Sequence, residues 1–546
     1  MGGDAPIRIQ SMTTTDTNNV DDSTAQSLKI VNAGGELVRL TTQGEREARS
    51  IGQVRKALDN LGCHTPLVAD VHFNPKAALT AAALVEAVRI NPGNYTGEAK
   101  RFNADADNMT DQQWHDLIIE KLTPLVETCR QHHTALRIGV NHGSLSDRIM
   151  AKYGDTPQGM VASCTEYLDA LEQLDFHDTA ISIKSSNTRV MVQTVRLLAA
   201  TLRQRGQVYP LHLGVTEAGS DAEGRIKSAA GIGALLNDGL GDTIRVSLTE
   251  APEKEIPVAR SLADHCAKLA LRQPVPQVDT SLYSPFSYVR RHSINVHAIG
   301  ANNHPVVITP SNAAADWFFS APDTITSPDG TSLHPVHLSL ANLLALPDDA
   351  ITDLKSRTDT VIVATCDSGN FQAEIRALAL QLSNLHVDLP FVCQYATSAN
   401  VDEQFQLEMA ADLGGLLIDG LIDGVIVPDA ALDAALILLQ ATRARFSRTE
   451  FISCPGCGRT LYDIQSTVAQ IKMRFGHLKG LKIGVMGCIV NGIGEMADAD
   501  YGYVGAGRGK ISLYRGKELV QRSLDQDLAL DALKQLIADD GKWLEP

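Results

Sequence analysis

The feature that most constrains this chain is a strand–helix pattern that repeats eight times in its first half. Each unit combines a short β-branched strand, a polar tip and an amphipathic helical stretch such as 45–62. The expected strands lie at 6–12, 36–42, 66–73, 87–93, 135–141, 179–186, 210–217 and 243–249. Eight units within residues 1–268 match a (β/α)8 barrel of the TIM type, which usually takes about 250 residues. A doubly wound sheet would use fewer strands and a Gly-rich first turn, so the pattern favours the barrel.

The composition and the strand–helix pattern of the sequence change twice after the barrel. An irregular stretch rich in Pro, Ser and Asn opens the segment 269–447, in which α/β-like elements follow. We expect an inserted α/β domain there with a scaffold or spacer role, because chemistry-capable residues do not cluster in it. Residues 448–546 combine short strands, a hairpin and a closing helix, which predicts a C-terminal α+β domain.

Composition limits the classes of function. A formal net charge of −16 argues against a nucleic-acid partner, which would need a basic face. No apolar run is long enough for a membrane span, and the first residues lack a secretory signal, so no membrane role is expected. Nine cysteines are too few for a disulfide scaffold and indicate a cytoplasmic, reducing environment.

Three cysteines near the C-terminus carry the strongest chemical signal. Cys454 and Cys457 form a C-x-x-C pair, and Cys488 follows in a Gly-rich loop. This spacing suits a metal–sulfur cluster, a structural zinc or a dithiol pair, although zinc would normally require a second ligand pair. Three cysteines leave one coordination position, for which Glu495, seven residues after Cys488, is the nearest candidate. The other cysteines are isolated, and we expect them to be buried, inert packing residues: Cys63, Cys129, Cys164, Cys266, Cys366 and Cys393.

Polar residues recur near the carboxyl ends of the expected barrel strands, where barrel enzymes build their active sites. The five cations among them are Arg39, Arg89, Arg137, Lys184 and Arg245. They are accompanied by Asp70, His72, Asn141, His212, Glu217 and Ser247. Internal ion pairing could explain one or two buried cations, but five converging on one mouth indicate an anion site, most naturally for phosphates.

Eight ordered motifs resemble one family. They are MTTTDT, LVADVHF, RINPGN, RIGVNHGSL, LHLGVTEAG, GDTIRVSL, CPGCGRT and GCIVNGIGE. This set is similar to the 4-hydroxy-3-methylbut-2-enyl diphosphate synthases, enzymes of the methylerythritol phosphate route to isoprenoids. The resemblance covers 4–259 and 449–546, and the intervening segment resembles the insert of the long, three-domain form.

The resemblance implies an iron–sulfur oxidoreductase. Its reaction would be the two-electron reductive ring opening and dehydration of 2-C-methyl-D-erythritol 2,4-cyclodiphosphate. It implies a [4Fe-4S] cluster on Cys454, Cys457 and Cys488, with Glu495 on the fourth iron until substrate displaces it. Glu217 would be the acid/base candidate, and the implied substrate-binding residues are Arg39, Arg89, Arg137, Asn141, Lys184, His212, Arg245 and Ser247. The implied partners are ferredoxin or flavodoxin as electron donor and a second subunit in a homodimer.

Three points stay open from the sequence. The family usually has a lead-in before the first strand, which here begins directly after MGGDA, so closure of the barrel bottom is in question. A first alternative function is a non-catalytic barrel that binds a phosphorylated metabolite and carries structural zinc. A second is a phosphosugar aldolase that uses Lys184 as a Schiff base.

Overall fold

A computed structural model describes residues 1–96, 109–397, 399–496 and 498–545. The chain divides into two compact units. The first comprises Met1–Gly224, Leu240–Arg260 and Arg448–Pro546, and the second comprises Arg225–Gly239 and Ser261–Ser447. The three domains expected from the sequence, 1–268, 269–447 and 448–546, stay a prediction.

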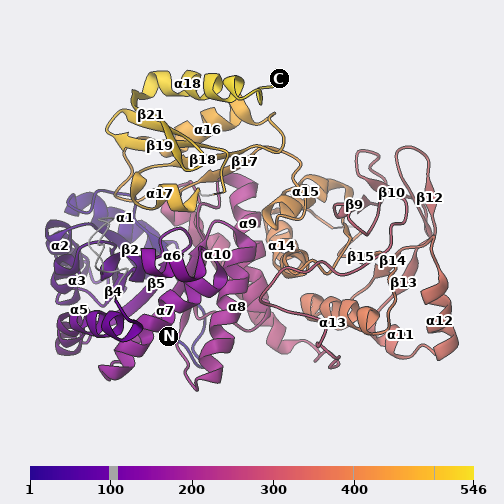
Figure 1. Ribbon diagram of the computed structural model, residues 1–546, viewed down its shortest axis with the longest axis horizontal. Coiled ribbons are helices and arrows are strands. Elements are labelled where there is room, and N and C mark those ends of the chain that lie inside the picture. The colour runs from indigo at the N-terminus through magenta and orange to yellow at the C-terminus, as the bar shows by residue number, and fades with distance from the viewer. Residues whose placement is uncertain (97–108, 398, 497, 546) are drawn as a thin grey trace. The chain divides into compact units, whose positions relative to one another are not determined.

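Eight parallel strands close into a barrel in sequence order, with the last strand pairing to the first (Figure 1). They are β1 (Arg8–Met12), β2 (Leu37–Thr42), β3 (Leu67–Val71), β4 (Ala87–Ile90), β5 (Ala135–Asn141), β6 (Thr179–Ser185), β7 (Leu211–Val215) and β8 (Thr243–Ile244). The helices of this region are α1 (Val20–Asn32), α2 (Glu45–Asn60), α3 (Pro75–Ala82), α4 (Pro92–Tyr95), α5 (Asp111–His132), α6 (Asp147–Tyr153), α7 (Pro157–Gln173), α8 (Thr188–Gln204), α9 (Asp221–Asn237) and α10 (Glu255–Ala267). The predicted TIM-type barrel is therefore confirmed.

The barrel strands are buried along most of their length, as parallel strands covered on both faces should be. All five residues of β3 are buried although Asp70 is one of them. A charged side chain in a buried strand is destabilising unless it has partners. Asp70 lies next to the carboxyl end of β3, so we look for its partners at that end of the barrel.

The last barrel strand is shorter than its sequence pattern predicts. The pattern indicated 243–249, whereas β8 contains only Thr243 and Ile244. The N–H of Leu248 donates to the side chain of Glu255 at 3.2 Å, so this backbone is held by a carboxylate instead of a neighbouring strand.

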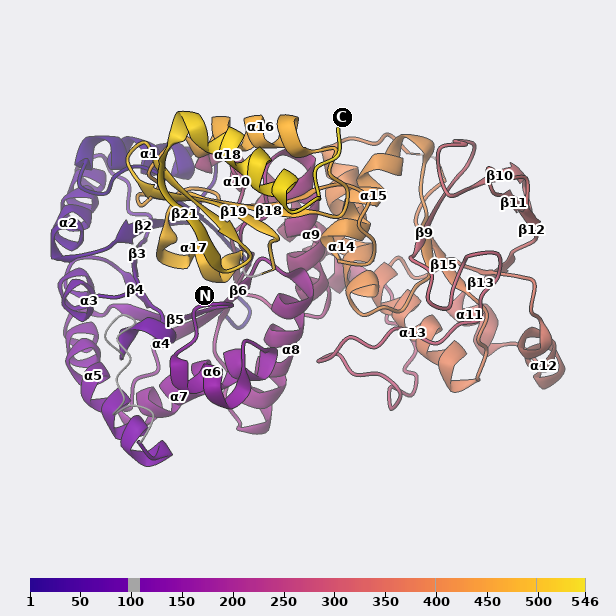
Figure 2. The same cartoon turned by 45° about the horizontal axis from the view of Figure 1, so that its top comes forward.

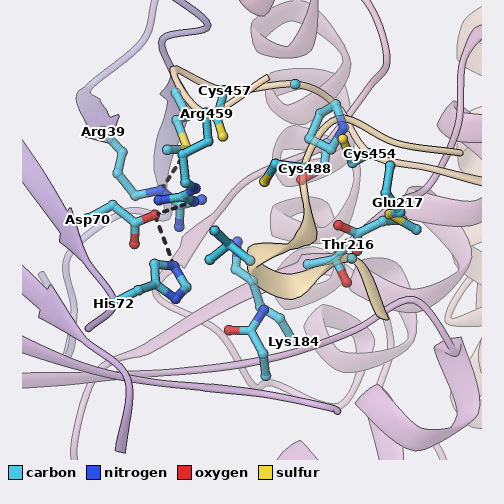
Figure 3. A pocket seen from close by; sticks show the side chains of 18 of the residues that line it. Arg39, Asp70, His72, Lys184, Thr216, Glu217, Cys454, Cys457, Arg459 and Cys488 are labelled. Carbon is cyan, nitrogen blue, oxygen red and sulfur yellow. Dashed lines mark hydrogen bonds and ion pairs between the residues drawn. The ribbon is translucent and has the colours of Figure 1, made fainter. Parts of the chain in front are cut away.

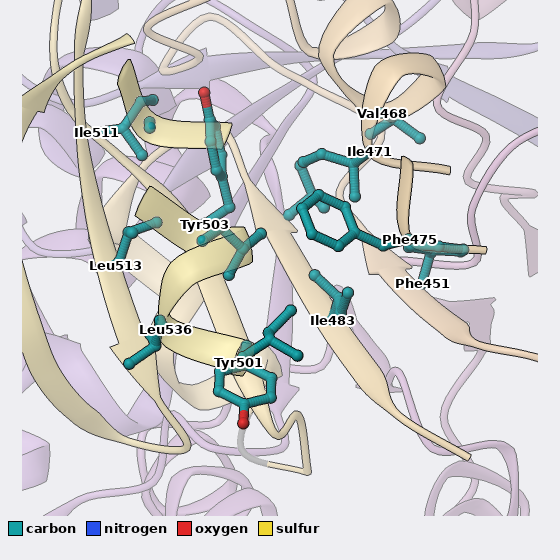
Figure 4. Packing of buried hydrophobic residues seen from close by; sticks show 14 of the residues in the cluster. Phe451, Val468, Ile471, Phe475, Ile483, Tyr501, Tyr503, Ile511, Leu513 and Leu536 are labelled. Atoms are coloured by element: carbon teal, nitrogen blue, oxygen red, sulfur yellow. The ribbon is translucent and has the colours of Figure 1, made fainter. Parts of the chain in front are cut away.

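The C-terminal region of the same unit is a five-stranded mixed sheet with three helices. Its elements are β17 (Glu450–Ser453), α16 (Ile464–Phe475), β18 (Lys482–Met486), α17 (Ile489–Glu495), β19 (Tyr501–Gly507), β20 (Lys510–Arg515), β21 (Glu518–Asp525) and α18 (Gln526–Asp539). The strands lie in sequence order, parallel from β17 to β19 and antiparallel beyond. Figure 4 shows the core, in which Phe475 and Ile483 pack with Tyr501 and Tyr503. The predicted α+β domain is confirmed.

The second unit contains an eight-stranded sheet in the order β12-β11-β10-β9-β16-β15-β14-β13. Its strands are β9 (Val306–Thr309), β10 (Trp317–Ala321), β11 (Thr324–Thr326), β12 (Ser332–Leu333), β13 (Val336–Leu338), β14 (Ile362–Ala364), β15 (Phe391–Gln394) and β16 (Gly424–Ile426). Its helices include α11 (Leu340–Leu344), α12 (Asp348–Ser356), α13 (Phe371–Asn384), α14 (Glu403–Ile418) and α15 (Leu432–Ala441) (Figure 2). The predicted α/β insert is confirmed, and its scaffold role stays a prediction.

Of the helices in the described ranges, none is both long and apolar enough to cross a membrane.

Candidate active site

A cavity at the carboxyl ends of the barrel strands brings both sequence signals together (Figure 3). The predicted residues that line it are Arg39, Arg89, Asn141, Lys184, Glu217, Arg245, Ser247, Cys454, Cys457 and Cys488. Arg137, His212 and Glu495 are not among its lining residues, although all three are buried. Asp70 and His72, also expected at the barrel mouth, line the cavity too, and the structure adds Thr216 and Arg459.

The cysteines reach the cavity because of the parallel pairing of β17 and β18. Cys454 follows the end of β17, and Cys488 lies two residues beyond the end of β18. Carboxyl ends of parallel strands meet at one sheet edge, so these two cysteines share that edge, and Cys457 lies three residues after Cys454. The remaining cysteines are elsewhere: Cys129, Cys164, Cys266 and Cys393 are buried, whereas Cys63 and Cys366 are only half-buried.

The donor set fits an iron–sulfur cluster. Cys454 Sγ accepts a hydrogen bond from the N–H of Gly487 at 3.3 Å, the kind of contact that tunes a cluster sulfur. Within the described ranges, no three His, Cys, Asp or Glu side chains converge closely enough to hold one metal ion. A cubane cluster binds each thiolate to a different iron, so three cysteines spread along one cavity wall suit that cofactor.

Three of the five barrel cations make no ion pair within the part of the chain that the structure describes: Arg39, Arg137 and Lys184. The Nε of Arg39 lies 3.1 Å from Met12 Sδ, and Arg137 Nη1 donates to Gln10 Oε1 at 2.7 Å. Burial, with Arg245 and Arg89 nearby, lowers the pKa of Arg39 to about 10. Burial and the charge of Arg39 lower the pKa of Arg137 to about 9. An anion bound here would relieve this repulsion.

Lys184 is the most strongly perturbed of these cations. Burial, together with Arg39 and Arg245, lowers the pKa of its ammonium group well below the usual value. Gly214 leaves room for it, since a Cβ on Gly214 would lie 3.3 Å from Lys184 Nζ.

The other two cations are held by carboxylates. Arg245 Nε and Nη2 donate to the two oxygens of Glu255 at 3.1 and 3.0 Å. Glu255 also accepts from Ser11 Oγ at 2.6 Å, which fixes the carboxylate in turn. Glu255 does not stand out in the sequence, because an acidic residue at the start of a helix such as α10 is ordinary.

Arg89 organises the floor of the cavity. Its Nη1 contacts Asp70 Oδ1 at 3.1 Å and His72 Nε2 at 2.7 Å, while its Nη2 donates to Asn141 Oδ1 at 2.5 Å. Burial and the charge of Arg89 lower the pKa of His72 to about 3, so its Nε2 accepts and its Nδ1 carries the proton. Burial alone would raise the pKa of Asp70, but Arg39, His72 and Arg89 hold it well below its usual range.

Arg459, also missed from the sequence, connects the cysteine loop to the barrel. Its Nη2 lies 3.5 Å from Asp70 Oδ2. Burial opposes its charge, but Cys457, Asp70 and Cys488 raise its pKa above the usual value. The signal that could have found it is its position two residues after Cys457.

The two predicted acidic residues lie together. Glu217 has a left-handed backbone, with φ of 49°, directly after Thr216 at the end of β7. Burial and the neighbouring Glu217 raise the pKa of Glu495 well above its usual value. Such a carboxyl pair can hold a proton near the cavity.

Replacing Lys184 by methionine is expected to stabilise the free protein and weaken diphosphate binding by about 10- to 150-fold, the effect of one charge-assisted contact. Because the folded-state pKa of Lys184 is lowered, the unfolded chain binds more protons at this residue, so the contribution of Lys184 to stability becomes more favourable with pH up to about 10.5. The stabilisation by Lys184→Met is therefore largest at low pH and fades as pH rises towards that value.

Melting temperatures across this pH range and calorimetric binding of inorganic pyrophosphate would check the Lys184 prediction. Lys56→Met, at an exposed position of α2, is the matched control. Unchanged pyrophosphate affinity in Lys184→Met would contradict the anion site.

Two family models match this chain: the GcpE TIM-barrel domain over residues 1–260 and the GcpE protein C-terminal domain over residues 450–539. Among curated relatives, a protein of Parabacteroides distasonis is 46% identical, with 100% of this chain and 97% of the relative covered. A protein of Akkermansia muciniphila is 41% identical, with 100% and 95% covered. Both are named 4-hydroxy-3-methylbut-2-en-1-yl diphosphate synthase (flavodoxin).

Solved structures show a more distant likeness. The dihydropteroate synthase of Stenotrophomonas maltophilia is 14% identical, with a TM-score of 0.31 and coverage of 50% of this chain and 95% of that chain.

Proposed function

Because this chain belongs to the GcpE family of 4-hydroxy-3-methylbut-2-en-1-yl diphosphate synthases, we propose that it reduces 2-C-methyl-D-erythritol 2,4-cyclodiphosphate. The reaction opens the cyclic diphosphate, takes up two electrons together with the protons needed to form water, and releases water, giving the allylic diphosphate. One observation supports this most: Arg39 and Lys184, which make no ion pair in the described part of the chain, line the same cavity as the three cysteines.

The cations hold the substrate's two phosphates. Arg39 and Lys184 line the cavity, and Arg245 is oriented there by Glu255. As the carbon–oxygen bond to phosphate breaks, negative charge grows on the leaving oxygen, and these fixed cations stabilise it. Ser247 and Asn141 line the same wall and can add neutral hydrogen bonds.

Arg89, Arg137 and His212 have supporting roles in this proposal. Both terminal nitrogens of Arg89 donate hydrogen bonds to protein groups, so Arg89 orients Asn141 and Asp70. Arg137 and His212 do not line the cavity, and Arg137 acts on the phosphates through its charge. Burial, with Arg137 and Lys184 nearby, lowers the pKa of His212 well below its usual value, so His212 contributes as a neutral ring.

Cys454, Cys457 and Cys488 would hold a [4Fe-4S] cluster, with Glu495 as the candidate fourth ligand. When bound, the cluster would supply electrons and a Lewis-acidic iron for cleavage of the substrate's carbon–oxygen bonds. Glu217 lies at the cavity beside Glu495 and is the candidate that delivers the proton for water release. The names of the curated relatives support flavodoxin as the electron donor.

The cysteines and the cations of the cavity come from one chain, which supports a cluster that acts on the barrel of its own chain. Catalysis would then not require the exchange of domains between subunits. The homodimer expected from the sequence stays a prediction.

The test is anaerobic purification of the full chain after cluster reconstitution. We expect about four irons and four acid-labile sulfides per chain and turnover of the cyclic diphosphate with reduced flavodoxin. One zinc without sulfide would overturn the reductive mechanism.

An aldolase is the second candidate, because the lowered pKa of Lys184 would also suit a Schiff base. Borohydride trapping of Lys184 with a phosphosugar would favour that alternative.

A further inference from the structure

Glu495, the last residue of α17, accepts hydrogen bonds from Asn141, Thr216 and Ser186, and its carboxyl group also contacts that of Glu217. Its Oε1 accepts from Asn141 Nδ2 at 2.8 Å, and its Oε2 accepts from Thr216 Oγ1 at 2.8 Å. The hydroxyl of Ser186 donates to its backbone carbonyl oxygen, also at 2.8 Å. The donors come from the ends of β5, β6 and β7, and Glu495 is only 2% exposed.

We infer that Asn141, Thr216 and Ser186 form a seat in the barrel wall for Glu495, and that Thr216 and Ser186 are positioning residues. A buried carboxyl group is destabilising unless its oxygens receive hydrogen bonds, and here each oxygen has its own donor. The third bond fixes the backbone at the end of the helix, so the position of the whole residue is specified.

Contacts within the barrel fix the orientation of the seat. Asn141 Oδ1 accepts from Arg89 Nη2, which cannot act as an acceptor, so the amide nitrogen of Asn141 must point the other way. That nitrogen is the donor to Glu495. Two elements of the barrel therefore determine the direction of the hydrogen bond that the C-terminal region receives.

A contact between two glycines brings α17 to the seat. A Cβ on Gly494 would lie 2.4 Å from the carbonyl oxygen of Gly143, and a Cβ on Gly143 would lie 2.4 Å from Gly494 Cα. Real Cβ atoms do not approach backbone so closely, so this approach requires glycine on both sides. The neighbour of Gly494 is Glu495, so the contact and the seat act on the same end of one helix.

The inference rests on the proposed function in one respect, namely that Glu495 is a candidate ligand of the cluster. When the Glu495 side chain occupies the seat, its two carboxylate oxygens accept hydrogen bonds from Asn141 and Thr216 and are not directed at a cluster on the cysteines. The seat therefore decides how available Glu495 is to a bound cluster, and with it whether the substrate finds a coordination position open.

The first experiment is hydrogen exchange on the full chain, with and without the cluster, in Thr216→Val. Valine keeps the shape of threonine and removes one donor to Glu495, so exchange in residues 489–496 should rise about tenfold or more. Thr179→Val is the matched control, because Thr179 is a buried barrel threonine whose hydroxyl has no hydrogen-bond partner in the described ranges. Unchanged exchange in Thr216→Val would overturn the seat, and Ser186→Ala repeats the test should Thr216→Val fail to fold.

The second experiment is the electron paramagnetic resonance spectrum of the reduced, substrate-free, cluster-loaded chain. Glu495→Ala gives the reference spectrum of a cluster that lacks this ligand. Loss of the seat frees Glu495 to bind the cluster, so the Thr216→Val spectrum should differ from this reference more than the wild-type spectrum does. The Thr179→Val spectrum should match wild type. Identical spectra for Thr216→Val and wild type would overturn the role at the cluster. Hydrogen exchange needs neither cluster nor substrate, so it tests the seat separately from the proposed function. If exchange in residues 489–496 rises in Thr216→Val but the wild-type chain does not turn over the cyclic diphosphate, the seat is supported and the proposed function is rejected.

Discussion

Cys488→Ser is expected to abolish the iron–sulfur cluster and lower turnover of the cyclic diphosphate by at least about 1,000-fold. Serine is close in size to cysteine, but its hydroxyl is a poor ligand for iron in a site built from thiolates. Cys488 lies at the carboxyl edge of β18 beside the cavity, so its loss removes one of three protein thiolates. Local folding should survive, since Cys488 is only half-buried.

Iron and sulfide counts, together with the visible absorption spectrum, would measure this effect. The matched control is Cys63→Ser, a half-buried cysteine after α2 that lies outside the cavity. It should retain wild-type metal content and turnover. A Cys488→Ser protein with full iron and sulfide would contradict the assignment of this residue as a ligand.

Gly494→Ala is expected to reduce kcat by about 100-fold while leaving the C-terminal region folded. Alanine favours a helix over glycine by about 1 kcal/mol, so α17 itself should gain stability. The added methyl group would meet the carbonyl oxygen of Gly143 at 2.4 Å, however, and the barrel and the cysteine region would have to separate. A displacement of about 1 Å in an active site is enough for a loss of this size.

Steady-state kinetics would measure the loss of kcat in Gly494→Ala. Small-angle scattering and iron content would show whether the C-terminal region is displaced from the barrel while it stays folded and able to bind the cluster. The cluster should load normally, because the cysteines are untouched. Gly507→Ala is the matched control in the same sheet, since its Cβ would have 3.7 Å to the nearest atom. Wild-type kcat in Gly494→Ala would show that the glycine contact is not needed for turnover.

The amino-acid sequence was sufficient for the fold and for the main chemical groups, because both depend on short-range patterns. Repeated strand and helix periods predict a barrel whatever the details of packing. Residues near the carboxyl ends of strands, such as Lys184 and Asn141, must meet at one mouth once the barrel closes. Cys454 and Cys488 each follow a strand, so their meeting required only that these strands be parallel neighbours.

Tertiary structure alone decided which of these groups are free to bind a ligand. Arg89 looked equivalent to Lys184 in the sequence, but Asp70 and Asn141 occupy its terminal nitrogens, whereas Glu255 orients Arg245 towards the cavity. The partners of Glu495 are as far as 354 residues away along the chain, and no local pattern encodes such a pairing. Periodicity specifies which side of a strand or helix a residue faces, whereas hydrogen bonds and ion pairs depend on distances of a few ångströms that exist only after folding.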